Sequence, residues 1–287
     1  MSTQSLQRSV RNRVLVAAML LLPALISAHH AVGQGSGARV MRQPTLVGLA
    51  RDNIVWVLGT FDPQRGWRND NQARSLFRRG QNMKVFNLQR QVGSTTLGAV
   101  ESGEEVGGWL AKGSRHFAGE TPLLAISGVH NVSPVVPRAQ ALLNPTYENV
   151  VAAMVRAQGV RAARGRLTQH LRVDLNGDGT REVLLCAHSR DALGRTSNAA
   201  KNDYALVVLR CVADGKVKNI PLQNDVYRTA QPFTASQRYA VVGCYDIDGD
   251  GALEIALWSG YYEGESLEIY KFDGRTARRV LAAGWGV

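Results

Sequence analysis

The chain has 287 residues and is basic, with 34 lysines and arginines against 23 aspartates and glutamates, which gives a formal net charge of +11. This balance favours contact with anionic polymers or membrane surfaces. No basic block is interleaved with aromatic residues, however, which argues against nucleic-acid binding. The cysteines Cys186, Cys211 and Cys244 allow at most one disulfide, and three buried thiols are the alternative. A disulfide-built scaffold is therefore excluded, and stability has to come from a hydrophobic core and from bound ions.

The first 28 residues predict an export signal. Arg8, Arg11 and Arg13 precede an apolar run over 14–28, and no acidic residue accompanies them. A run of about 15 residues is shorter than the ~20 that a membrane-spanning helix needs. We therefore expect a signal peptide over 1–28 and a secreted, periplasmic or cell-surface protein, with an uncleaved anchor as the alternative. Residues 29–44 are glycine-rich and predict a flexible linker.

Short β-like runs at 45–50, 54–58, 84–88 and 123–126, separated by glycine-containing turns, predict a small β module over 45–128. Between residues 65 and 90 this module is strongly basic. We expect Arg74, Arg78 and Arg79 to contact an anionic envelope polymer or glycan, and a solvated basic face is the alternative.

Residues 129–166 predict a connector followed by one amphipathic helix. Asn144 is a good N-cap and Pro145 suits the first helical position. Apolar residues follow at helical spacing, which predicts a stripe that faces a core; they are Tyr147, Val150, Val151, Met154 and Val155.

Two nine-residue segments repeat the same oxygen-rich loop, one at 174–182 and the other at 246–254. In each, side-chain oxygens occupy positions 1, 3, 5 and 9, and glycine occupies position 6, where a sharp turn is needed. Such hard oxygen ligands suit Ca²⁺.

The loops belong to a longer repeat over 167–287. Each copy has four strand-like runs in the same order, and an Asp-Gly turn at 214–215 or 273–274 joins the last two runs of its copy. We predict two four-stranded antiparallel blade-like meanders, within a chain that is mainly β (α+β) overall.

Position 12 of an EF-hand loop carries a bidentate glutamate, but here it is Leu185 or Leu257 within a strand-like run, so that family is excluded. The loops resemble those of FG-GAP and VCBS-type repeats, which link two strands of a β-propeller blade. The Gly-Ala-Pro part of the FG-GAP signature is absent, and two copies cannot close a propeller of four to eight blades. The resemblance implies two structural Ca²⁺ ions, bound by Asp174, Asn176, Asp178, Glu182 and the Thr180 carbonyl, and by Asp246, Asp248, Asp250, Glu254 and the Ala252 carbonyl. The C-terminal pattern around Trp258 and Trp285 resembles uncharacterised secreted bacterial proteins.

No catalytic motif stands out. The histidines have no metal-ligand spacing, and no nucleophile elbow or phosphate loop occurs. Four C-terminal aromatic residues could line a sugar-binding surface or pack in a core; they are Trp258, Tyr261, Tyr262 and Trp285. We therefore expect an exported, calcium-binding, non-enzymatic binding or scaffold protein of the bacterial envelope. An extracytoplasmic hydrolase with structural calcium is the alternative.

Overall fold

A computed structural model describes residues 43–286, except 105–106, 120, 129–131, 133–134, 162, 192 and 235. The predicted signal peptide and all but the last two residues of the predicted linker lie outside the described residues. Among the helices of the described part, none is long and apolar enough to cross a membrane.

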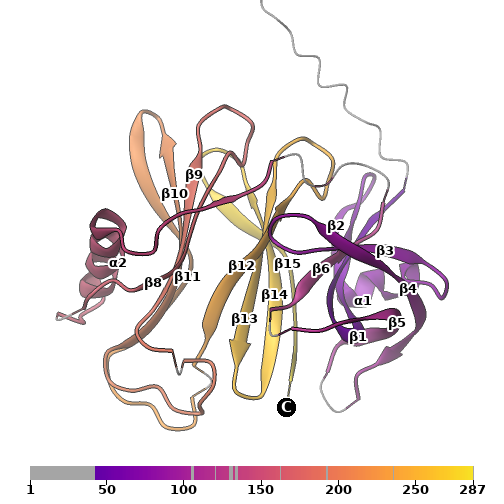
Figure 1. Cartoon of the computed structure of the whole chain (residues 1–287), viewed down its shortest axis with the longest axis horizontal. Helices are drawn as coiled ribbons and strands as arrows, with labels where there is room; N and C mark the ends of the chain where they lie inside the picture. The colour runs from indigo at the N-terminus through magenta and orange to yellow at the C-terminus, as the bar shows by residue number, and fades with distance from the viewer. Residues whose placement is uncertain are drawn as a thin grey trace, which may run out of the picture. The chain divides into compact units, whose positions relative to one another are not determined.

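The described residues form three antiparallel sheets and little helix (Figure 1). The prediction of a mainly β chain is therefore confirmed.

The first sheet contains β1 (Thr45–Asp62), β2 (Gly66–Asn69), β3 (Asn82–Phe86), β4 (Gln91–Ser102), β5 (Trp109–Phe117) and β6 (Leu123–Ile126). The long β1 reverses direction at Asp52, whose φ is 52°, and the Thr60 hydroxyl then donates to the Thr45 carbonyl at 2.9 Å. The first half of β1 pairs with β6 and the second half with β5. Strand β5 pairs with β4, β4 with β3 and β3 with β6, so the strands form a closed ring. We call this ring of strands the closed sheet.

Side chains alternate between the inside and the outside of the closed sheet, as a pleated strand requires. Inside lie Leu46, Ala50, Val55, Val57, Met83, Val85, Leu97, Ala111, Phe117 and Ala125. Ala73 and Phe77 join them, at the ends of the short helices α1 (Asp70–Ala73) and η1 (Arg74–Leu76). The capping box of Asn69 and Gln72 starts α1.

The second sheet has the strand order β11-β10-β9-β8-β7, and the third has the order β12-β13-β14-β15. The second comprises β7 (Arg138–Ala139), β8 (Leu167–Val173), β9 (Glu182–His188), β10 (Asp203–Ala213) and β11 (Lys216–Tyr227). The third comprises β12 (Arg238–Tyr245), β13 (Glu254–Tyr261), β14 (Gly264–Phe272) and β15 (Ala277–Gly286).

Helix α2 (Pro145–Ala157) covers one face of the second sheet (Figure 1). Asn144 caps it by accepting from the backbone N–H of Tyr147 at 3.4 Å. Val151 and Val155 are fully buried against Leu185 and Leu206 of the sheet.

The third sheet is buried on both faces. One face packs against the second sheet through residues such as Leu184, Val207 and Ile255. The other packs against the outside of the closed sheet, where the rings of Trp56 and Trp285 stack with centroids 4.9 Å apart. The third sheet thus lies between the other two (Figure 1), and its strand β13 is buried at six of eight positions for that reason.

Candidate metal centre

The two oxygen-rich segments occupy equivalent places. The first loop (174–182) joins β8 to β9, and the second loop (246–254) joins β12 to β13. They adjoin one another, because the backbone N–H of Leu253 in the second loop donates to the Leu175 carbonyl in the first at 2.7 Å.

The aspartate at position 1 organises each loop from within. The carboxylate of Asp174 accepts from the N–H groups of Gly177 and Gly179, at 2.8 and 2.9 Å. Asp246 repeats both contacts with the glycines at positions 4 and 6 of the second loop, at 2.7 and 3.2 Å. The glycines at position 6 have φ angles of 84° and 92°, the left-handed region in which a side chain is strained.

The glutamate at position 9 is buried in both loops and anchors position 2. One oxygen of Glu182 accepts from the Leu175 N–H at 2.9 Å, and one oxygen of Glu254 accepts from the Ile247 N–H at 2.8 Å. Leu175 and Ile247 themselves are fully buried, so each loop is pinned to a core.

The middle of each loop is more exposed. Asp178 accepts from the Thr180 N–H at 2.7 Å, and Asp250 accepts from the Ala252 N–H at 3.0 Å. This contact lowers the pKa of Asp178, so its carboxylate stays charged.

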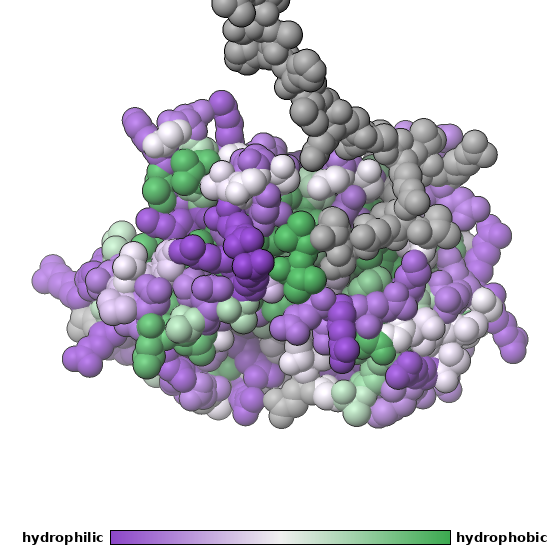
Figure 2. All heavy atoms as spheres, turned by 45° about the horizontal axis from the view of Figure 1, so that its top comes forward, coloured by the Kyte–Doolittle hydropathy of each residue, from purple (hydrophilic) through white to green (hydrophobic). Residues whose placement is uncertain are grey.

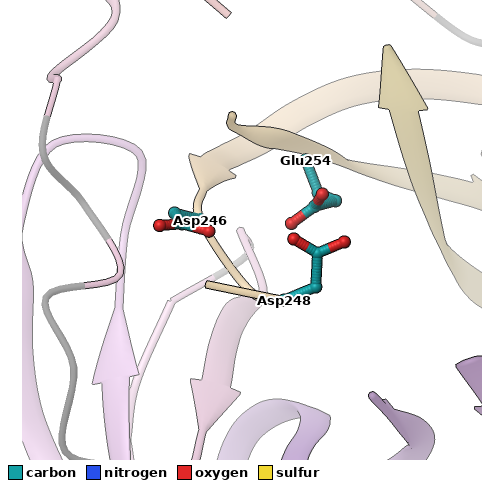
Figure 3. A group of neighbouring side chains, drawn as sticks. All are labelled: Asp246, Asp248 and Glu254. Atoms are coloured by element: carbon teal, nitrogen blue, oxygen red, sulfur yellow. The ribbon is translucent and has the colours of Figure 1, made fainter. Parts of the chain in front are cut away.

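In the second loop, Asp246, Asp248 and Glu254 each offer a carboxylate oxygen, and these oxygens lie within 4.8 Å of one another. Figure 3 shows Asp248 and Glu254 facing each other, with Asp246 beside them at the start of the loop. Burial, followed by the charge of Asp248, raises the pKa of Glu254 to about 8. Burial also raises the pKa of Glu182 in the first loop. A cation in either loop would offset these penalties.

A lysine that the sequence analysis missed reaches into the second loop. The Lys271 ammonium, on β14, donates to Asp248, to Asp250 at 2.7 Å and to Glu254 at 3.2 Å. Partial burial opposes its charge, but the carboxylates outweigh that effect and raise the pKa of Lys271. Only strand register brings Lys271 here, because it lies 17 residues beyond Glu254 in the chain.

The structure also places the other candidate residues. Cys186, Cys211 and Cys244 are buried free thiols. Trp258 and Trp285 are buried in the core and donate to Glu265 at 2.6 and 3.2 Å, whereas Tyr262 is exposed.

The three arginines of the predicted basic contact are all exposed. The Arg74 guanidinium lies 4.0 Å over the Trp109 ring. Arg78 and Arg79 line an open cavity of about 510 Å³ beside Pro44.

A separate cavity of about 450 Å³ lies where the three sheets meet, lined by residues that include His188, Thr168, Arg238 and Trp258. Within the described part of the chain, the His188 Nδ1 and Thr168 hydroxyl atoms have no hydrogen-bond partner. Burial is the main cause of a lowered pKa at His188, so its imidazole is neutral at physiological pH. This lining suits a small polar ligand.

Comparison with known proteins gave no match to a family model, to a curated protein or to a solved structure.

Proposed function

We propose that this chain is an exported calcium-binding protein of the binding or scaffold type, in which calcium holds together the loop ends of two packed sheets. The observation that carries the proposal is the duplicated loop. The same internal hydrogen bonds at positions 1, 5 and 9 occur in two segments that differ at positions 2, 3, 7 and 8.

The chemistry of the loops favours calcium over other metals. Each offers side-chain oxygens and a carbonyl at position 7, with no histidine or cysteine among the nine residues. Ca²⁺ takes six to eight oxygen ligands, and water can complete such a set, whereas zinc sites favour nitrogen and sulfur.

The FG-GAP or VCBS-type relationship is part of this proposal. Apart from the two-residue edge strand β7, the second sheet runs through β8–β11 in chain order, and the third sheet runs through β12–β15. In both sets of four, the oxygen-rich loop follows the first strand and an Asp-Gly turn joins the third to the fourth. We regard them as two blade-like copies of one ancestral unit.

Calorimetric titration of the chelator-treated protein tests the function. Calcium should bind, and Asp178→Asn should weaken binding in the first loop while keeping an oxygen that accepts from the Thr180 N–H. Asp191→Asn is the control, because Asp191 is an exposed aspartate that pairs with Arg166 outside both loops. A wild-type protein that takes up no calcium would refute the proposal.

The hydrolase alternative is supported by the cavity that holds a neutral His188, a group suited to act as a general base. A screen with glycans, phosphoesters and peptides tests it. Any activity found should disappear in His188→Gln, and activity that survives this change would locate the chemistry elsewhere.

A further inference from the structure

We propose that Lys271 is the resident cation of the second loop, so that in the native chain calcium enters the first loop only. This inference rests on the calcium binding proposed above, and it names the residue that decides which of the two loops is open to a metal ion.

The Lys271 ammonium is bound as fully as an ammonium can be. Its three N–H donors match three acceptors, on Asp248, Asp250 and Glu254. The lysine side chain is 18% exposed, and the Glu254 side chain is completely buried. The ammonium therefore binds carboxylates that a calcium ion in the second loop would need.

In the part of the chain that the structure describes, no lysine occupies the equivalent place beside the first loop. Ile255 and Val183 each follow the glutamate at position 9 of their loop. Ile255 pairs with Tyr270, the residue before Lys271. Val183 pairs with Arg210, the residue before Cys211. The place of Lys271 is thus taken by Cys211, a buried thiol. Among the ion pairs that the described residues form, none involves a carboxylate of the first loop.

The charges of the two loops agree with this difference. The formal charges are −4 for the four carboxylates of the second loop, or −4 + 1 = −3 with Lys271, and −3 for the three carboxylates of the first loop, which has Asn176 at position 3 and Arg181 at position 8. The extra carboxylate is Asp248, and it is one of the groups that bind Lys271. In the second loop, calcium would first have to displace the ammonium.

Calcium can bind the second loop only in molecules from which Lys271 has moved away. The apparent dissociation constant for calcium is therefore the intrinsic one divided by the fraction of such molecules. A minor state of 0.1–10% is typical, so we expect Lys271→Met to tighten calcium binding there by roughly 10- to 1,000-fold.

Calorimetry on the full-length protein tests the inference. Wild type should bind one calcium ion and Lys271→Met should bind two. Asp178→Asn should weaken binding of the wild-type ion, and adding Asp178→Asn to Lys271→Met should leave binding of the new ion unchanged. Lys112→Met is the matched control, since Lys112 is an exposed lysine on β5 of the closed sheet, and it should leave one site.

A second measurement needs no variant in the loop. Reductive methylation followed by mass spectrometry should find Lys271 protected with and without calcium, while the exposed Lys201 and Lys216 react.

The outcomes separate the inference from the function. Wild type with two calcium ions, or Lys271 that becomes reactive when calcium is added, would overturn the inference and leave the function intact. A folded Lys271→Met that gains no site would also overturn it. Wild type without calcium would overturn the function, and a gained site in Lys271→Met would still support the role of Lys271.

Discussion

At the residue scale, the sixth position of each loop shows how backbone geometry selects an amino acid. Gly179 and Gly251 have left-handed φ angles, yet a Cβ built on either meets no atom within 4 Å. Substitution there would strain the backbone without producing an overlap, so the expected effect comes from conformation alone.

We predict that Gly179→Ala and Gly251→Ala each lower the free energy of unfolding by about 1–2 kcal/mol, because a Cβ is unfavourable in the left-handed region. Gly179→Asn and Gly251→Asn should lower it less, since asparagine tolerates this region better. Denaturant unfolding in chelator measures the difference without a contribution from metal. Equal effects of alanine and asparagine would contradict the explanation.

At the element scale, one buried carboxylate joins the closed sheet to the third sheet. Glu265 on β14 accepts from the indole N–H groups of Trp258 and Trp285, and it pairs with Arg51 of β1 at 2.8 Å. Trp285 in turn stacks on Trp56 of β1. Aromatic residues that could have lined a sugar-binding surface thus form part of the packing between sheets.

We predict that Glu265→Leu lowers the free energy of unfolding by about 3 kcal/mol or more, because it removes the acceptor of two buried indole N–H groups and the ion pair with Arg51. Glu265→Gln should be milder, since its carbonyl still accepts from an indole. Paired denaturant titrations measure both. If Glu265→Leu lowered the free energy of unfolding no more than Glu265→Gln does, these hydrogen bonds would contribute little to stability.

At the scale of the whole molecule, a backbone hydrogen bond from Leu253 to Leu175 joins the two loops. The residue at position 2 of each loop, Leu175 or Ile247, is buried in a core. A bound ion would tighten ends of sheets that are already packed together. Calcium should therefore act on stability and not on conformation.

We predict that ~1 mM calcium stabilises the protein by about 0.4–1.4 kcal/mol per occupied loop, for dissociation constants of roughly 10⁻⁴–10⁻³ M. The melting temperature should rise by a few degrees. Circular dichroism and small-angle scattering should change little when calcium is chelated. A large rearrangement on chelation would contradict a stapling role.

The surface is the other feature of the whole molecule. Figure 2 shows hydrophilic residues over most of one face, with smaller apolar areas between them. The exposed Arg74, Arg78 and Arg79 lie between β2 and β3 of the closed sheet.

We predict salt-sensitive sedimentation with anionic vesicles at ~50 mM salt that is weakened at ~300 mM, because screening shortens the range of surface charges. Replacing these three arginines by serine should weaken it further. The matched control replaces three exposed arginines elsewhere, Arg161, Arg228 and Arg278. Equal losses in both triple variants would point to net charge and not to a specific contact.

The amino-acid sequence by itself determined what depends on short spacing. It predicted a mainly β chain from alternating runs, and it located two loops whose defining contacts join residues no more than seven apart. Calcium in these loops, export and the basic contact stay predictions. Lys271 and the network around Glu265 were decided by the tertiary structure alone. The Lys271 and Asp248 pair spans 23 residues, and the Arg51 and Glu265 pair joins two different sheets. Contacts of this kind depend on strand register and on which faces pack together, and neither is encoded in local spacing.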